Sequence, residues 1–211
     1  MADFPSTTSA YGRWNLADQR DAVMGNNWPK LITYEVLTFT ANNGNVTITN
    51  NGTDSVSVFK TAGSSAWDTK AYVATPYTAP FTVEYTKQAG ASDNGVSYAM
   101  ISLNTDPTAN NSYTSLDYAS YPFNQSNYQV YNNGSLVLNT GTWNPANRFY
   151  YVYDSAGNVK HYNGSTLLYS VNAGTGRTVY VDIALYSVNA TFGGYSNVKA
   201  IKQVWNGTAY V

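Results

Sequence analysis

The chain has no cysteine and only one histidine, His161, among its 211 residues. The absence of cysteine excludes disulfides, thiolate metal sites and thiol redox chemistry. A single histidine excludes a histidine-rich metal site, and a Ser-His-Asp triad would need distant serine and aspartate residues to converge on it. His161 lies between Lys160 and Tyr162 in a segment that is expected to be a hairpin strand. We therefore expect it at the surface and without a catalytic role.

Charge is also scarce: charged residues make up 11% of the chain, and the formal net charge is −1. Such a chain has no basic surface to attract phosphate, which argues against a nucleic-acid partner. No apolar run approaches the roughly 20 residues that a membrane-spanning helix needs, which predicts a soluble chain without membrane insertion. The first ten residues lack the charged and apolar regions of a secretory signal, so export would need a route such as cell lysis.

The chain does contain segments in which apolar and polar residues alternate. Residues 81–85 and 179–185 place apolar side chains at every second position, a pattern typical of half-buried β-strands with one face toward solvent. The chain is 43% hydrophobic and 15% aromatic, enough for one sizeable core. We predict an all-β fold, an antiparallel two-sheet β-sandwich, with a short N-terminal helix-containing segment.

Asn-Gly pairs predict hairpins, because a type I′ turn requires positive φ at both central residues. They occur at Asn43-Gly44, Asn51-Gly52, Asn94-Gly95, Asn133-Gly134 and Asn163-Gly164. The clearest case is a three-stranded meander with strands expected at 149–153, 159–162 and 165–169.

Residues 11–29 depart from this pattern and carry helix signals. Asn15 is suited to be an N-cap, Asp18 falls in the first turn, and Gly25 can end the helix in the left-handed conformation. A helix shorter than about 12 to 15 residues is marginal in isolation, so we expect it to dock on another surface. Covering one end of the sandwich is the simplest role for it. We place a domain boundary here, with residues 1–30 as an attachment segment and 31–211 as the sandwich.

The same segment resembles an element of the form W-x-L-x-x-Q, a small residue and W-P that recurs in structural proteins of tailed bacteriophages. The resemblance covers about twenty residues and implies attachment to a neighbouring virion protein. The residues to which it assigns this role are Trp14, Leu16, Gln19, Val23, Trp28 and Pro29. Arg20 and Asp21 stand where such elements often carry other residues.

A second resemblance covers residues 45–201 and involves concanavalin A-like lectin/glucanase modules of phage and bacterial surface proteins. It rests above all on the pattern Tyr153-Asp154-x-x-Gly157-x-Val159-Lys160-x-Tyr162-x-Gly164. Further matches are Ser65-Ala66-Trp67-Asp68, 81–85, 98–103, Asp106-Pro107, 128–134 and Asn197-Val198-Lys199. The resemblance implies a jelly-roll sandwich that is used to bind glycans or to mediate adhesion.

Glucanases of this architecture carry clustered carboxylates in a Glu-x-Asp-x-x-Glu arrangement, because one acid protonates the leaving oxygen while another stabilises or attacks the sugar. This chain has only Glu35 and Glu84, and neither has such a partner. We expect Glu84 to be an exposed strand carboxylate and the protein not to be an enzyme. Asp106, Asp117 and Asp154 are scattered, which leaves calcium binding open; no cofactor is expected.

Aromatic and amide side chains between residues 117 and 143 are candidates for contact with a sugar, because flat rings can cover C–H faces and amides can bind hydroxyls. The candidates are Tyr118, Tyr121, Asn124, Gln125, Tyr128 and Trp143. The alternative is that these rings line the core or cover its rims, since the chain has 20 tyrosines.

Together the two resemblances predict a non-enzymatic virion protein: a tail-fibre or adhesin component that binds a host surface glycan and other phage proteins. A capsid decoration protein with the same sandwich is the alternative. A homotrimer is considered because fibre tips are often trimeric, which would bury exposed aromatic rings. A secreted bacterial adhesin is disfavoured by the N-terminal sequence.

Overall fold

The computed structural model describes residues 32, 34–87, 98–124, 127–141, 143–188, 194–207 and 211. Apart from residue 32, these belong to one compact unit, Thr33–Val211. The helix predicted between Asn15 and Gly25, and all six residues assigned to virion attachment, lie outside the described residues. The structure does describe one short 3-10 helix, η1 (Tyr113–Ser115).

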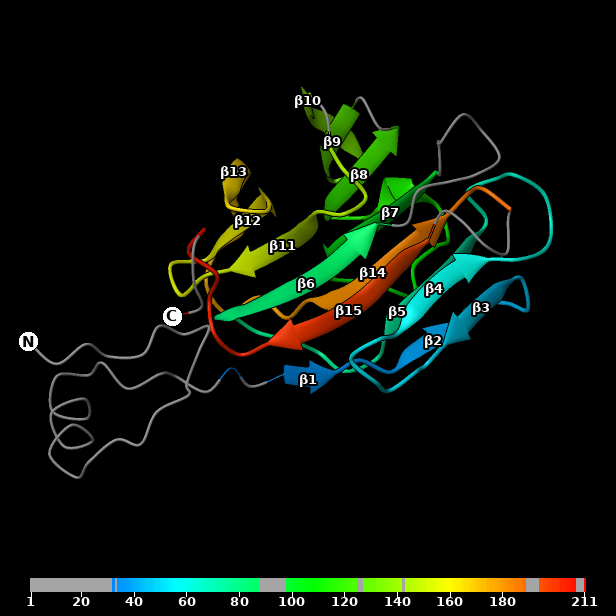
Figure 1. The fold of residues 1–211 in the computed structure, drawn as a ribbon, viewed down its shortest axis with the longest axis horizontal. Coiled ribbons are helices and arrows are strands. Elements are labelled where there is room, and N and C mark those ends of the chain that lie inside the picture. Colours follow the sequence, from blue (N-terminus) through cyan, green and yellow to red (C-terminus); the bar gives the residue numbers. More distant parts are fainter. Residues whose placement is uncertain are drawn as a thin grey trace, which may run out of the picture. The chain divides into compact units, whose positions relative to one another are not determined.

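The described strands form two antiparallel sheets (Figure 1), which confirms the predicted β-sandwich. The eight-stranded sheet has the order β13-β12-β11-β6-β15-β4-β3, with β1 also paired to β15. Its strands are β1 (Tyr34–Val36), β3 (Val46–Thr49), β4 (Ser57–Lys60), β6 (Phe81–Lys87), β11 (Arg148–Tyr153), β12 (Asn158–Asn163), β13 (Thr166–Asn172) and β15 (Tyr195–Ile201).

The seven-stranded sheet has the order β10-β9-β8-β7-β14-β5-β2. Its strands are β2 (Phe39–Ala41), β5 (Thr69–Val73), β7 (Ala99–Asn104), β8 (Tyr118–Asn124), β9 (Asn127–Asn132), β10 (Ser135–Thr140) and β14 (Tyr180–Leu185). Consecutive strands pair as hairpins in parts of each sheet, but other neighbours come from distant parts of the chain: β6, for example, lies between β11 and β15.

The core between the sheets is unusually rich in tyrosine. Tyr85, Tyr151 and Tyr195 of the eight-stranded sheet are fully buried among Val and Ile side chains. Their hydroxyls reach across to the other sheet: Tyr151 donates to the carbonyl of Ile101 at 2.6 Å, and Tyr195 donates to the carbonyl of Ala99 at 2.9 Å. Tyrosine thus supplies both apolar area and the polar contacts that join the two layers.

The predicted meander is present as β11, β12 and β13, and the Asn-Gly turns of the described chain differ in type. At Asn133-Gly134, between β9 and β10, both residues have positive φ, as the type I′ prediction requires. In the meander, Asn163 pairs with Thr166, so Gly164 and Ser165 form the loop. Only Gly164 has positive φ there, 58°, which is the pattern of a type II′ turn.

The prediction that strands 81–85 and 179–185 leave one face to solvent is wrong. In β6, Thr82 and Glu84 are buried although they point away from the core, and in β14 so are Asp182 and Ala184. On the eight-stranded sheet, Thr82 is covered by the C-terminal segment, where its hydroxyl donates to the carbonyl of Gln203 and accepts from the backbone N–H of Trp205. Glu84 is covered by Arg148 and Lys199. On the seven-stranded sheet, loops bring aromatic rings over the strands.

Candidate functional site

The outward side of the seven-stranded sheet carries a cluster of seven aromatic rings, which we call the aromatic face. Strand alternation defines this side: Ile101 and Leu103 of β7 point into the core, so Met100 and Ser102 point outward. The aromatic face consists of Trp67, Tyr98, Tyr113, Tyr121, Phe123, Tyr131 and Tyr186. Tyr121 is buried, and the other six rings are partly exposed.

Trp67, in the loop before β5, is the centre of this cluster. Its ring centroid lies 5.1 Å from that of Tyr113 and 5.4 Å from that of Tyr186. It also meets Tyr121 edge-on at 5.9 Å. The ring therefore bridges η1, β8 and the segment after β14, three elements far apart in the sequence.

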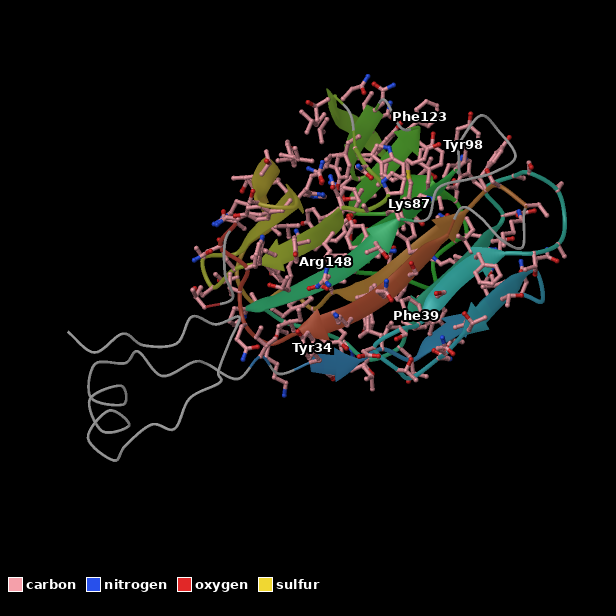
Figure 2. All side chains as sticks on the ribbon, viewed as in Figure 1. Tyr34, Phe39, Lys87, Tyr98, Phe123 and Arg148 are labelled. Atoms are coloured by element: carbon pink, nitrogen blue, oxygen red, sulfur yellow. The ribbon has the colours of Figure 1, made fainter. Side chains whose placement is uncertain are left out.

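The second part of the aromatic face lies at the ends of β7 and β8. Tyr98 and Phe123 lie close together there in Figure 2, with ring centroids 5.2 Å apart. Tyr121 contacts both rings from β8. Because each ring is held by two or more others, the surface is preorganised and a ligand would not have to order it.

Below the rings, the floor of the aromatic face is apolar at one side and polar at the other. Met100, Ala119 and Ala184 are buried there beneath the aromatic rings. The polar side centres on Asp182, whose Oδ2 accepts a hydrogen bond from Asn104 Nδ2 at 2.8 Å and lies 2.9 Å from Lys70 Nζ. A few fixed polar groups beside aromatic surface are the usual composition of a small-ligand site.

The side chains on this polar side are buried and interact closely with one another. Lys70 is 2% exposed and also donates to the carbonyl of Asn110 at 2.6 Å, which joins the 105–112 loop to β5. Burial raises the pKa of Asp182, while the Lys70 ammonium and the Asn104 amide act in the opposite direction. Given the 2.9 Å contact we treat Lys70 and Asp182 as an ion pair. Asp182 Oδ1 and Ser102 Oγ, on paired residues, are buried without a hydrogen-bond partner among the described residues.

The hydroxyls of Tyr121 and Tyr131 in the aromatic face remain protonated near neutral pH. Burial raises the pKa of Tyr121, and nearby tyrosines raise it further. Burial likewise raises the pKa of Tyr131, whose hydroxyl donates to Gln129 Oε1 at 3.3 Å. The rings thus offer apolar faces with neutral donors and acceptors at their edges.

Of the residues predicted to contact a sugar, only Tyr121 belongs to the aromatic face. Tyr118 and Tyr128 point to the core side, as strand parity dictates, and Trp143 packs on Phe149 with centroids 6.1 Å apart. Tyr118, Tyr128 and Trp143 are at most 5% exposed and line the core, whereas Tyr121 is 6% exposed within the aromatic face. The side chain of Asn124 and all of Gln125 lie outside the described residues.

Two polar residues lie elsewhere than the sequence suggested. His161, expected at the surface, is fully buried, because its position in β12 has the parity of the core-facing Val159. Glu84, expected to be exposed, is 4% exposed and its Oε1 lies 2.9 Å from Arg148 Nη1 and 3.2 Å from Lys199 Nζ. Glu84 is covered by side chains of the flanking strands β11 and β15, although strand alternation places it on the outward side of the sheet.

Sequence reasoning missed six rings of the aromatic face as binding residues. In the sequence, Trp67 stands out only as part of the resemblance to lectin/glucanase modules. Tyr121 and Phe123 are two positions apart in β8, so alternation along the strand places both rings on the same face. This spacing is a local signal for an aromatic pair. Tyr98 and Tyr186 flank strands, so only the pairing of β7 with β14 brings them together.

A buried Ser120–His161 pair exists, with Oγ 3.0 Å from Nδ1, but both side chains are fully buried between the sheets. In the part of the chain that the structure describes, no group of three or more His, Cys, Asp or Glu side chains is placed to hold a metal ion. Within the same part, no helix has the length and apolar character needed to cross a membrane.

No family model and no curated protein matches the chain. Among solved structures, the SPRY domain of human HERC1 is similar over 80% of this chain and 97% of that domain, with 11% identity and a TM-score of 0.53. The exoplasmic/lumenal domain of VIP36, in its Ca²⁺/Man2-bound form, is similar over 78% of this chain and 80% of that one, with 8% identity and a TM-score of 0.52. At these identities the similarity concerns the fold. The chain therefore has the concanavalin A-like jelly-roll sandwich fold that lectin and SPRY domains share.

Proposed function

We propose that this chain is a non-enzymatic, lectin-like module that binds glycans through the aromatic face. The observation that carries the proposal is the cluster itself: six partly exposed rings, held by Tyr121 and by each other, cover one side of a sheet. Exposed apolar clusters of this kind mark interaction sites. The VIP36 domain, which shares the fold, has a solved Ca²⁺/Man2-bound form, and this supports a sugar as the ligand class.

The chemistry of the aromatic face fits a neutral sugar better than a charged ligand. Ring faces can cover the C–H surface of a pyranose, while the hydroxyls of Tyr98, Tyr113 and Tyr131 can exchange hydrogen bonds with its hydroxyls. The charged groups beneath, Lys70 and Asp182, are buried and neutralise each other. A neutral glycan would therefore gain contacts without the desolvation of an unpaired charge.

The test is a glycan-array screen of the full-length protein, followed by calorimetric titration of the best glycan. Trp67→Leu and Tyr98→Leu should each weaken binding at least about ten-fold, because aromatic anchors dominate binding energy. Leu167→Ala, at an exposed position on β13 of the other sheet, is the control and should leave affinity unchanged. Equal affinity in all three variants would exclude the aromatic face as the site, and release of hydrolysis products would contradict a non-enzymatic role.

We also propose that the module belongs to a tailed bacteriophage particle, as a tail-fibre or adhesin component, with residues 1–30 as its attachment segment. The support is the spacing of Trp14, Leu16, Gln19, Trp28 and Pro29. Deletion of residues 1–30 should leave a folded protein that no longer joins the particle. Normal incorporation of the truncated protein would overturn the attachment role, and hundreds of copies on the head would indicate a decoration protein instead.

A further inference from the structure

A cleft lies at another part of the sandwich, where β1 and the end of β15 face the loop before β6. This cleft has a volume of about 450 Å³, within the roughly 300–1,000 Å³ typical of small-ligand pockets. None of its residues belongs to the aromatic face. It is lined by Glu35, Pro76, Tyr77, Thr78, Pro80, Phe81, Ala200, Ile201 and Lys202.

The orientation of β1 is the first sign that this cleft has a role. Tyr34 and Val36 are about half exposed, whereas Glu35 between them shares the side of its buried partner Ala200. The strand thus turns its hydrophobic side chains to solvent and its carboxylate toward the interior, the reverse of what folding alone favours. Departures from the usual pattern, in which apolar side chains are buried and charged ones are exposed, are expected at functional sites.

One wall of the cleft is flat, apolar and held in place. The Tyr77 ring stacks on Phe81 with centroids 5.1 Å apart. The Tyr77 backbone exchanges two hydrogen bonds with Val179, the residue before β14, at 2.8 and 2.9 Å, which fixes the loop that carries the ring. Pro76 and Pro80 flank this wall and restrict the loop further.

The polar groups of the cleft are of opposite charge. Glu35 and Lys202 both line it, so their charges balance and a ligand of either net charge would meet one repulsive group. Burial, and secondly the Glu35 carboxylate, raise the pKa of Tyr77 and keep its hydroxyl protonated. The cleft therefore presents an aromatic wall, a hydrogen-bond acceptor and hydrogen-bond donors.

We propose that this cleft is a second carbohydrate site, which takes one sugar ring against Tyr77 with its hydroxyls bound by Glu35 and Lys202. A purely apolar ligand would leave the carboxylate and the ammonium desolvated and unpaired. A pyranose has an apolar C–H face for the tyrosine wall, hydroxyl donors for Glu35 and oxygen acceptors for Lys202. The cleft would make the chain bivalent and does not depend on the aromatic face being a site.

The experiment is a titration of ¹⁵N-labelled full-length protein with the methyl α-glycosides of glucose, mannose and galactose, followed by amide chemical shifts. At least one glycoside should shift the amides around Tyr77 and Lys202. Glu35→Gln should raise the Kd of that glycoside at least about ten-fold, since a hydrogen bond to a charged acceptor is stronger than one to a neutral acceptor. Lys202→Gln, at an exposed position, tests the second contact without risk to the fold. Asp106→Asn, an exposed acid outside the cleft, is the matched control and should change nothing.

Other outcomes would reject the cleft as a sugar site, assign it another ligand, or separate it from the aromatic face. Unchanged Kd in both cleft variants, or no shift at the cleft with any glycoside, overturns the proposal even if shifts occur at the aromatic face. Tighter binding of free glycine than of the glycosides, lost in 0.5 M salt, would assign the cleft to a zwitterion instead. Trp67→Leu should leave cleft shifts intact, so failure at one site is distinguishable from failure at the other.

Discussion

His161 Nδ1 of β12 lies 3.0 Å from Ser120 Oγ of β8, so a hydrogen bond joins the two sheets at the centre of the core. Ser120 Oγ is also 2.5 Å from the hydroxyl of Tyr128, which in turn lies 3.3 Å from that of Tyr85. The other imidazole nitrogen, Nε2, is buried without a hydrogen-bond partner among the described residues. A neutral imidazole is tolerated here, whereas a charged one would lack a counter-charge.

Acid should therefore destabilise the fold through His161. Burial lowers the pKa of His161 to about 3, so between pH 6.5 and 3 the unfolded chain binds a proton that the folded chain does not. Stability is thus lost as pH falls below 6.5, by about 2 kcal/mol between pH 7.5 and 5.0. Urea unfolding at these two pH values measures the difference.

His161→Phe is the matched variant for this measurement. It keeps a ring against Tyr151, whose centroid lies 4.7 Å away, and leaves Ser120 its contact with Tyr128. The variant should lose most of the stability difference between pH 7.5 and 5.0. An equally large difference in the variant would show that other groups cause it.

Strand positions and hairpins could be predicted because they depend on neighbours in sequence. The alternation in 81–85 and 179–185 and the turn at Asn133-Gly134 are local signals, and the structure places strands and a turn there. The burial of His161 also follows from local parity, once Val159 is known to face the core. The predicted surface position ignored that parity.

The aromatic face could not be predicted in the same way, because long-range pairing creates it. Trp67 meets Tyr113 and Tyr186 only because β5 and β7 both pair with β14. The burial of Glu84 is a similar case, since β11 and β15 supply Arg148 and Lys199 from either side. No local pattern encodes which strands become neighbours.

The carboxylate of Glu84 should contribute more to stability than its exposed partner Arg148. Glu84→Gln leaves Lys199, whose side chain is 14% exposed, without its counter-charge and should cost about 2 kcal/mol or more. Arg148→Ala removes a side chain that is 61% exposed, so it should cost less than about 1 kcal/mol. Urea unfolding at pH 7 compares them, and a larger loss for Arg148→Ala would contradict this assignment.

Gly157, in the turn between β11 and β12, should not tolerate a side chain. Its φ is +84°, and a Cβ would lie 2.5 Å from the carbonyl carbon of Gly174 and 2.7 Å from the nitrogen of Thr175. Gly157→Ala should therefore cost about 3 kcal/mol, from backbone strain and a clash that only backbone movement relieves. Gly164→Ala is the control: φ is +58° but nothing lies within 4 Å of the Cβ, so about 1 kcal/mol is expected. Similar melting temperatures for the two variants would rule out the close contact.

The ion pair beneath the aromatic face should be required for the fold because Asp182 is fully buried. Lys70→Met removes the cation 2.9 Å from Asp182 Oδ2 and leaves a buried carboxylate that keeps the Asn104 amide but loses this counter-charge. The expected loss is about 3 to 5 kcal/mol at pH 7. Adding Asp182→Leu to this variant removes the uncompensated charge, so the double variant should recover part of the loss. Urea unfolding of both variants tests the coupling, and a double variant less stable than Lys70→Met would show that Asp182 stabilises the sheet independently of Lys70.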